Sequence, residues 1–252
     1  MRIALAGGTG VVGRHVDRLA RERGHDVVVL ARSRGIDLVS GEGLNLGGVE
    51  VVIDVAGPGK DERGNPSAFF ERVTTNLLNA EEDAGVEHHV ALSIIGAAQI
   101  NAGYYAGKRV QEDLVAAGTA EWTILRATQF FEFAEQTAVP LGPWAVAPKV
   151  LSQPIAAASV AAELLRLAEG AVLHGDLDAL GVHEIAGPEE RRIADLLREQ
   201  LGARADARRV IELPLPGKFG RGLRDGSILP GPAAVIDSVT FEEWLAAEHP
   251  RA

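Results

Sequence analysis

Residues 6–14, which read A-G-G-T-G-V-V-G-R, decide the fold. An apolar run at residues 3–6 leads into them, and a helix-like stretch at residues 11–23 follows. A strand, a glycine-rich turn and a helix in this order are typical of a turn that binds the pyrophosphate of a dinucleotide. Glycines let the backbone bend sharply and approach the phosphates, while the start of the helix presents unpaired N–H groups and the positive end of its dipole.

The glycines of this turn fit two overlapping patterns. Gly8, Gly10 and Gly13 match G-x-G-x-x-G, and Gly7 with Gly10 and Gly13 matches G-x-x-G-x-x-G. Gly10 should permit close approach of the phosphates, and Gly13 should let the helix pack on the strand. The alternative is a tight turn without a ligand, which seldom needs four glycines in seven residues. The predicted cofactor contacts in the turn are Gly7, Thr9, Gly10, Val11, Val12 and Gly13.

Apolar runs and amphipathic stretches alternate along the chain. The expected strands are residues 26–31, 36–39, 49–56, 88–93, 121–126, 182–186 and 208–213, and the expected helices are 11–23, 67–84, 156–168, 187–201 and one opened by the capping box at 240–243. This alternation predicts an α/β fold, a doubly wound parallel sheet with a small C-terminal α+β lobe. We expect a dinucleotide-binding domain at 1–150 and a smaller substrate-side region at 151–252 that also completes the sheet.

Composition excludes several function classes. The chain has 252 residues and a net charge of −10, which argues against nucleic acid as a partner because phosphate backbones favour basic surfaces. It contains no cysteine, so disulfides and thiolate sites are excluded, and we predict no metal site. No signal peptide or membrane-spanning stretch is expected. We therefore expect a cytoplasmic monomer or homodimer with a small-molecule substrate.

The end of the second strand indicates which cofactor is bound. NAD-binding proteins usually place an acid there for the ribose hydroxyls, but residues 31–34 read A-R-S-R. Arg32 and Arg34 can hold a 2′-phosphate through charge-assisted hydrogen bonds, and Ser33 can add a hydroxyl. We therefore predict NADP(H) in preference to NAD(H). The alternative is that the two arginines are only solvated.

Three further features lie near the predicted strand ends. Ala56 and Gly57, in a turn that reads A-G-P-G, are expected along the cofactor. Asp54 is unusual inside a strand, and we interpret it as a hydrogen-bonded structural carboxylate without assigned chemistry. His88 and His89 point to opposite strand faces, so we interpret them as a strand entrance near solvent and not as a metal pair.

Ser93, Tyr104 and Lys108 form a candidate catalytic set. Tyr104 and Lys108 are four residues apart, so they share one face of a helix. An ammonium beside a phenol is expected to lower the tyrosine pKa, and such a pair can exchange a proton with a carbonyl oxygen that Ser93 also binds. The alternative is an aromatic helix start with a surface lysine. We expect the neighbouring Tyr105 only to pack.

The segment after the strand at 121–126 is a candidate substrate pocket, although aromatic clusters are as often plain core. The predicted pocket residues are Thr128, Gln129, Phe130, Phe131 and Trp144. The Pro- and Gly-rich stretch at 214–232 is a candidate lid or edge segment.

Together these motifs resemble the NmrA-like, atypical short-chain dehydrogenase/reductase proteins. The resemblance is carried by G-G-T-G-V-V-G, the Arg32 turn, L-S-I-I-G at 92–96, Y-Y-A-G-K at 104–108, W-T-I-L-R-A-T-Q-F-F-E-F at 122–133, H-E-I-A-G-P at 183–188 and T-F-E-E-W at 240–244. It implies a Rossmann domain that binds NAD(P)(H), with glycines equivalent to Gly7, Gly10 and Gly13 on the pyrophosphate. It also implies a C-terminal region over the nicotinamide, Lys108 on the nicotinamide ribose, and Ser93, Tyr104 and Lys108 as the catalytic set.

Two functions remain open, with a third disfavoured. The first is an NAD(P)H-dependent oxidoreductase that transfers hydride to or from a small, mainly apolar carbonyl or quinone-like substrate. The alternative is an NADP(H)-binding redox sensor without turnover. A nucleotide-sugar epimerase is disfavoured, because the C-terminal lobe is small and lacks a basic cluster for a sugar diphosphate.

Overall fold

The computed structural model describes residues 1–59 and 64–249, which fall into two compact units. The first unit comprises Met1–Arg126 and Val160–His183, and the second comprises Ala127–Ser159 and Glu184–Ala252. This division differs from the expected boundary at residue 150, because the chain leaves the first unit after residue 126 and returns to it within the helix that begins at Ala157.

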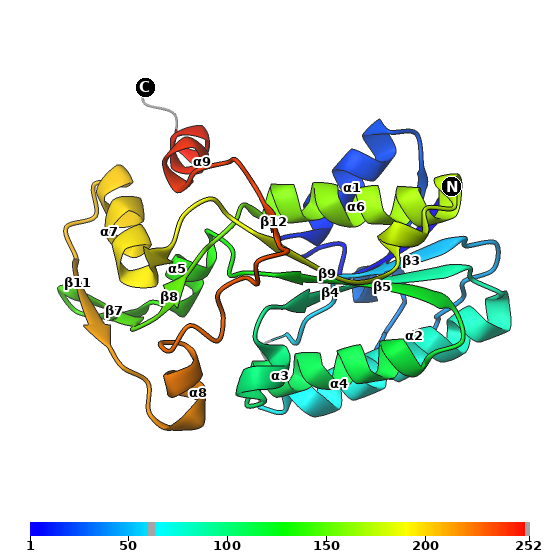
Figure 1. Ribbon diagram of the computed structural model, residues 1–252, viewed down its shortest axis with the longest axis horizontal. Coiled ribbons are helices and arrows are strands. Elements are labelled where there is room, and N and C mark those ends of the chain that lie inside the picture. The colour runs from blue at the N-terminus through cyan, green and yellow to red at the C-terminus, as the bar shows by residue number, and fades with distance from the viewer. Residues whose placement is uncertain (60–63, 250–252) are drawn as a thin grey trace. The chain divides into compact units, whose positions relative to one another are not determined.

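The main sheet has the strand order β12-β9-β5-β4-β3-β1-β2, and its registered pairs β1–β2, β1–β3, β3–β4 and β12–β9 are parallel. Within the first unit, α1 and α6 cover one face of the sheet and α2 and α4 cover the other (Figure 1). The doubly wound α/β fold is thereby confirmed. The elements are β1 Arg2–Ala6, α1 Gly13–Glu22, β2 Asp26–Leu30, β3 Val51–Asp54, α2 Pro66–Ala84, β4 His88–Ile94, α3 Ala97–Ile100, α4 Tyr104–Ala117, β5 Glu121–Ala127, α6 Ala157–His174 and β9 Gly181–Ala186.

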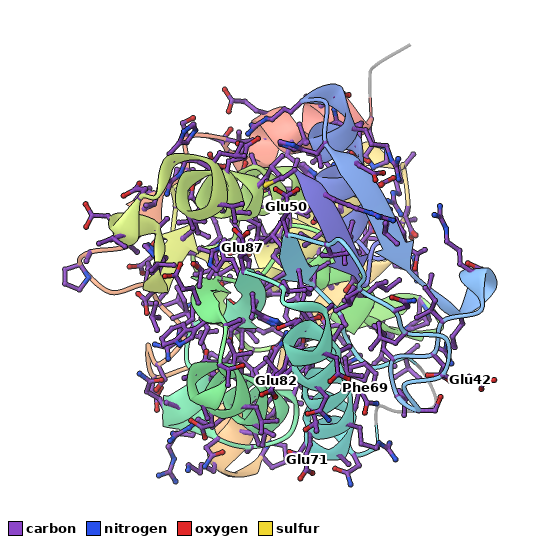
Figure 2. The ribbon with its side chains drawn as sticks, turned by 90° about the vertical axis from the view of Figure 1, so that its right-hand side faces the viewer. Glu42, Glu50, Phe69, Glu71, Glu82 and Glu87 are labelled. Atoms are coloured by element: carbon purple, nitrogen blue, oxygen red, sulfur yellow. The ribbon has the colours of Figure 1, made fainter. Side chains whose placement is uncertain are left out.

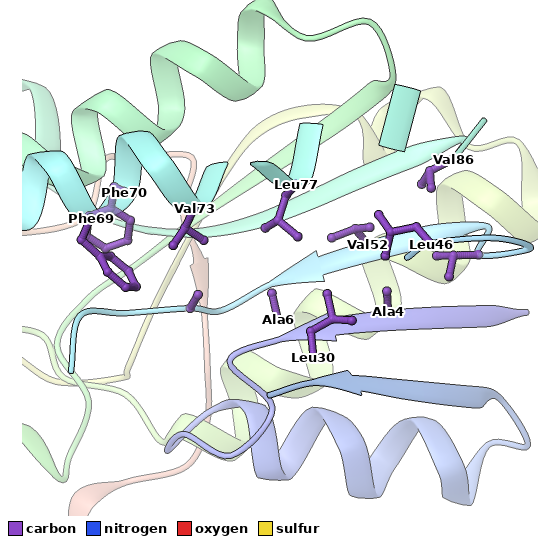
Figure 3. Packing of buried hydrophobic residues seen from close by; sticks show 12 residues of the cluster. Ala4, Ala6, Leu30, Leu46, Val52, Phe69, Phe70, Val73, Leu77 and Val86 are labelled. Atoms are coloured by element: carbon purple, nitrogen blue, oxygen red, sulfur yellow. The ribbon is translucent and has the colours of Figure 1, made fainter. Parts of the chain in front are cut away.

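The core between the sheet and α2 explains the continuous apolar strands. Ala4 of β1 and Val52 of β3 pack with Phe70, Val73 and Leu77 of α2, and all five are buried (Figure 3). Neighbouring positions on β1, such as residues 3 and 5, are fully buried as well. Parallel strands covered on both faces lose the alternation of polar and apolar residues.

Acidic side chains are exposed on the α2 side of the first unit. Glu71 and Glu82 of α2 and Glu42 of the loop after β2 are exposed, in keeping with the negative net charge (Figure 2). Glu81, which adjoins Glu82, is instead 2% exposed. In the part of the chain that the structure describes, no helix has the length and apolarity needed to cross a bilayer.

The second unit is built on a three-stranded sheet in the order β11-β7-β6, with β11 parallel and β6 antiparallel to β7. Thr240 and Glu243 form the predicted capping box of the last helix, so that expectation is confirmed. The 214–232 segment contains a short helix. The elements are α5 Phe133–Thr137, β6 Val139–Leu141, β7 Trp144–Pro148, β8 Leu151–Ser152, β10 Arg191–Arg192, α7 Ile193–Ala203, β11 Arg209–Leu213, α8 Gly217–Gly222, β12 Val235–Ile236 and α9 Phe241–Glu248.

Three local expectations were wrong. Residues 36–39 form turns and not a strand, and Asp37 makes one isolated bridge to Glu42. The predicted helix from residue 187 begins only at Ile193, because residues 191–192 pair with β8. His88 and His89 are each 1% exposed and do not lie near solvent, since each ring is hydrogen-bonded to another element.

Candidate functional site

The glycine turn joins β1 to α1 through close backbone approaches. Gly7 has φ +77°, and a Cβ there would lie 2.7 Å from the Val55 carbonyl carbon. A Cβ on Gly13 would lie 2.6 Å from Gly8 Cα. The Gly10 N–H donates to the Gly7 carbonyl at 2.9 Å, which closes the turn. Side chains at these positions would therefore push the turn away from β3 or from α1.

Helix α1 begins without a capping side chain. Its N-cap residue, Val12, contributes no side-chain hydrogen bond, and its first turn carries no acidic residue among the described residues. The first N–H groups of a helix need acceptors, and an anion is a favourable one there. This helix start therefore suits a pyrophosphate.

A cavity of about 350 Å³ adjoins the glycine turn. It gathers residues from the turn, from the end of β2 and from the loop after β3. Its lining consists of Gly7, Thr9, Leu30, Ala31, Arg32, Ser33, Ile36, Asp37, Leu38, Val39, Ala56, Gly57, Gly59 and Phe69. Six predicted cofactor residues thus line one cavity, whereas Gly10, Val11, Val12 and Gly13 lie in the adjoining turn.

Arg32 and Ser33 bring a guanidinium and a hydroxyl to the cavity lining. Residues Arg32–Arg34 form a single 3-10 turn, η1, that follows β2 directly and ends at Gly35 with φ +77°. Arg34 belongs to this turn but is not part of the cavity lining among the described residues. A guanidinium and a hydroxyl at one rim suit a phosphate monoester.

Several other residues that line the cavity were not predicted from the sequence. Phe69 comes from the first turn of α2, while Ile36, Asp37 and Leu38 come from the segment expected to be a strand. The Asp37 carboxylate accepts a hydrogen bond from Val39 N–H at 2.8 Å, which shapes this part of the lining. A run of glycines around residues 35–48 was the available signal for a compact turn. The apolar walls and the cationic rim fit an adenosine with a phosphate.

Tyr104 is the first residue of α4 and lies beside the cofactor loop. Its ring packs edge-on against Phe70, with centroids 5.5 Å apart, and a methyl group on Gly57 would lie 3.9 Å from its hydroxyl. Desolvation by the surrounding protein and repulsion by Asp54 raise the pKa of Tyr104 above its ordinary value. The predicted lowering of this pKa is therefore wrong: the acid from β3 opposes ionisation.

Lys108 shares the Tyr104 face of α4 but is buried, with 3% exposure. Its Nζ donates to the Leu92 carbonyl at 2.6 Å and to Gln111 Oε1 at 2.8 Å. The same atom lies 4.4 Å from the Phe70 ring centroid and 5.9 Å from that of Tyr104. Burial lowers the pKa of Lys108 to about 8, although Asp54 and Glu112 oppose the shift. The alternative of a surface lysine is excluded.

Ser93 lies near the end of β4, and its hydroxyl is hydrogen-bonded to the carboxylate of Glu112. Its hydroxyl donates to Glu112 Oε1 at 2.5 Å, and Glu112 also accepts two hydrogen bonds from Arg126. A hydroxyl has one proton to donate. The structure therefore does not show Ser93 presenting its proton to a reacting oxygen, as the sequence suggested.

The predicted substrate-pocket residues all belong to the second unit. Thr128 donates to the Gln153 carbonyl, and Gln129 accepts from Ser152. Phe131 packs edge-on against Phe241 and at a tilt against Trp244 of α9. Thr128, Gln129 and Phe131 are buried parts of that unit's interior, while Phe130 and Trp144 are partly exposed. Their role in substrate binding stays a prediction.

Two remaining expectations are settled by hydrogen bonds and burial. Asp54 is fully buried and accepts from Ala56 N–H and from Gln111, so its interpretation as a structural carboxylate is confirmed. Tyr105 is 5% exposed and packs, as expected.

Comparison with known proteins identifies the family. A family model described as NAD(P)H-binding matches residues 45–170. The photosystem II assembly factor Ycf39 of Synechocystis is 30% identical over 163 residues, which are 56% of this chain and 49% of that protein. The chain thus spans about half the length of the curated relative it matches.

Solved structures show the same fold. A short-chain dehydrogenase/reductase superfamily protein of Agrobacterium tumefaciens with bound NAD superposes with a TM-score of 0.65, at 17% identity and full coverage of both chains. The UDP-glucose 4-epimerase of Thermus thermophilus in complex with NAD gives 0.64, at 17% identity, covering 99% of this chain and 93% of that one. The family match over residues 45–170 shows that the chain belongs to the NAD(P)H-binding family, and the solved structures show that it shares their fold.

Proposed function

We propose that the protein is an NADP(H)-dependent oxidoreductase acting on a small, mainly apolar carbonyl or quinone-like substrate. One observation carries the proposal: Arg32, Ser33 and Gly57 line the same cavity beside the glycine turn, and a Cβ on Gly57 would lie 3.9 Å from the Tyr104 hydroxyl. A nucleotide site and a proton donor therefore adjoin each other within one unit.

The preference for NADP(H) rests on the rim of the cavity. Arg32 supplies a permanent positive charge and Ser33 a hydroxyl where β2 ends. A 2′-phosphate adds negative charge at that point of the ribose, so it gains charge-assisted hydrogen bonds that a 2′-hydroxyl does not.

Tyr104 is the group that we assign as proton donor in the direction of carbonyl reduction. When bound, the cofactor supplies the hydride for the carbonyl carbon. Tyr104 stays protonated at neutral pH, so it can donate its phenolic proton to the substrate oxygen as that oxygen gains charge. Lys108, on the same helix face, stabilises the phenolate left behind and binds the nicotinamide ribose.

A second candidate is an NADP(H)-binding regulatory protein without turnover. The Ser93–Glu112 hydrogen bond favours it, since that bond leaves the reacting oxygen without the expected serine donor. The similarity to a protein named as an assembly factor supports the same reading.

The cofactor assignment is tested by calorimetric titration with NADPH and NADH. We expect tighter binding of NADPH by the parent, and a loss of about 10- to 150-fold for NADPH in Arg32→Ala, from about 1.5–3 kcal/mol for a hydrogen bond to a charged group. Arg34→Ala is the matched control, because Arg34 belongs to the same turn outside the cavity lining. Equal parent affinities for both cofactors contradict the proposal.

Turnover is tested with Tyr104→Phe against a panel of apolar carbonyls and quinones. We expect unchanged NADPH binding and a loss of about 10²- to 10⁴-fold in turnover, because the proton donor is removed. Tyr105→Phe is the control and should keep turnover, since that ring only packs. If the parent binds NADPH but oxidises it with no member of the panel, the regulatory candidate replaces the enzyme.

A further inference from the structure

Asp54 is a fully buried carboxylate at the end of β3 whose two oxygens are used in different ways. Oδ1 accepts from Ala56 N–H at 2.9 Å, and Ala56 lines the cofactor cavity. Oδ2 accepts from Gln111 Nε2 at 2.7 Å. Both of these partners are uncharged, so the negative charge of Asp54 is not neutralised by them. A buried charge without an opposite charge nearby is costly.

Gln111 bridges Asp54 and Lys108 by hydrogen bonds, and these two partners fix the orientation of its amide. A carboxylate only accepts hydrogen bonds, so the Gln111 amide must turn its nitrogen toward Asp54. Its oxygen then faces Lys108 and accepts from Nζ at 2.8 Å. Gln111 itself is fully buried. In the chain Asp54–Gln111–Lys108, Lys108 therefore donates to Gln111, and Gln111 donates to Asp54.

Lys108 uses two of its three ammonium N–H groups on acceptors of the protein. An ammonium has three N–H groups, and two of them serve Gln111 and the Leu92 carbonyl. Phe70 of α2 presents its ring face to the same ammonium, which favours the cation. The hydrogen bonds hold the charged nitrogen in place at one side.

The charges that act on Lys108 come from several elements. Asp54 reaches it from β3, and Glu112 acts on it from its own helix. Glu112, however, is paired with Arg126 of β5 and accepts from Ser93 of β4. Asp54 and Glu112 therefore both favour the charged form of Lys108, and Asp54 has the larger effect of the two.

Two further titratable residues lie on the same side. Tyr104 of α4 carries its ring 5.9 Å from Lys108 Nζ, and His89 of β4 is paired with Glu81 of α2. Asp54 acts on both the phenol and the imidazole as well as on the lysine. A change at Gln111 leaves the charges of these groups in place and alters only the link between Asp54 and Lys108.

We propose that Asp54 and Gln111 are positioning residues that keep the Lys108 ammonium charged and directed at the nicotinamide ribose of NADP(H). The inference rests on the proposed function, since it assigns the ribose as the ligand of Lys108. Through Ala56, the same carboxylate also fixes the loop that lines the cofactor cavity, so one buried acid organises two parts of the site.

The test compares Gln111→Met and Gln111→Glu in calorimetric titrations with NADPH from pH 7 to 9.5. The parent should lose affinity as Lys108 loses its proton near pH 8. Gln111→Met removes the acceptor and should move this midpoint down by about one pH unit. Gln111→Glu is the conservative variant: beside Asp54 its carboxyl is held protonated, donates to Asp54 and still offers an oxygen to the ammonium, so the midpoint should stay near that of the parent. A downward shift in Gln111→Met that is absent in Gln111→Glu is not expected if Gln111 only fills space.

Gln200→Met is the matched control, because Gln200 is also a buried glutamine, 2% exposed, and donates to a backbone carbonyl in the second unit. It should leave the pH midpoint of NADPH binding where the parent has it, whatever it does to stability. If both Gln111 variants fold, by circular dichroism, and keep the parent midpoint, the positioning role is overturned.

A cofactor-free measurement separates this inference from the proposed function. NMR titration of the lysine side chains reports the Lys108 pKa directly, and its signal is assigned with Lys108→Arg because lysines are few in the sequence. If the parent does not bind NADPH, the proposed function fails, while a lowered Lys108 pKa in Gln111→Met with a parent-like pKa in Gln111→Glu still supports the Asp54–Gln111–Lys108 chain. Unchanged Lys108 pKa values in both variants overturn it.

Discussion

Replacing Gly13 with alanine tests whether the glycine turn works through close packing. The added Cβ would lie 2.6 Å from Gly8 Cα and closer still to the Gly7 carbonyl oxygen. Both of those atoms are backbone, so no side chain can rotate out of the way. The turn and the start of α1 must separate by about one ångström to reach an ordinary contact distance.

The size of the effect follows from this geometry. Overpacking by one methyl group costs about 1–3 kcal/mol, and each kcal/mol lowers the melting temperature of a chain of this size by about 2–4 °C. The same displacement moves the first N–H groups of α1 away from a pyrophosphate. Loss of one hydrogen bond to a charged group weakens NADPH binding by about 10-fold or more.

Urea denaturation and calorimetric NADPH titration measure both effects in Gly13→Ala. Gly202→Ala is the matched control: Gly202 lies in α7, and a Cβ there meets no heavy atom within 4 Å among the described residues. Because glycine inside a helix costs about 0.5–1 kcal/mol relative to alanine, this control should raise stability. A Gly13→Ala protein that unfolds and binds NADPH like the parent refutes the packing argument.

Three other substitutions have expected outcomes in urea denaturation. The pKa of Lys108 is lowered to about 8 in the folded protein, so above that pH the unfolded chain binds one more proton than the folded one. The free energy of unfolding of the parent relative to Lys108→Met should therefore rise by about 2 kcal/mol between pH 7.5 and 9.5. If this difference in free energy does not change with pH, Lys108 is an ordinary lysine. Glu81 lies 2.7 Å from His89 in a buried pair and raises the pKa of that histidine. Glu81→Gln should therefore lower the free energy of unfolding by about 3–5 kcal/mol below pH 6.5, and by less as the pH rises through the raised pKa. A loss that does not depend on pH would argue against a charged pair. Thr240→Ala removes one half of the capping box of α9 and should cost about 1 kcal/mol at every pH, and an unchanged midpoint would mean that α9 unfolds separately.

Local patterns were enough for most of the first unit. The order of β1, the glycine turn, α1 and β2 follows from periodicity and glycine spacing, which neighbouring residues determine. The segment at 36–39 was misjudged because a distant side chain holds it: Asn76 of α2 donates to the carbonyls of Leu38 and Val39. Similarly, pairing of residues 191–192 with β8 delays the start of α7.

In the candidate site, too, local features could be predicted from the sequence, whereas contacts between distant residues could not. The turn and Arg32 were found from spacing alone, and the structure brings both to one cavity. The pKa of Tyr104 was predicted in the wrong direction because Asp54 lies 50 positions away in sequence and nothing local links the two. The hydrogen bond of Ser93 to Glu112 was not foreseen for the same reason, since Glu112 belongs to another element. Partners that folding brings together decide protonation and hydrogen bonding.

Helix α1, whose N-cap side chain makes no capping hydrogen bond, has a consequence for how long the protein survives. A helix end that a bound anion completes is weaker in the empty protein, so occupancy and folding are thermodynamically linked. At a nucleotide concentration 100 times the dissociation constant, that linkage adds about 2.7 kcal/mol to the native state. Without bound nucleotide, the chain should unfold more often and be degraded by proteases faster. We therefore expect its cellular abundance to fall when the nucleotide concentration falls.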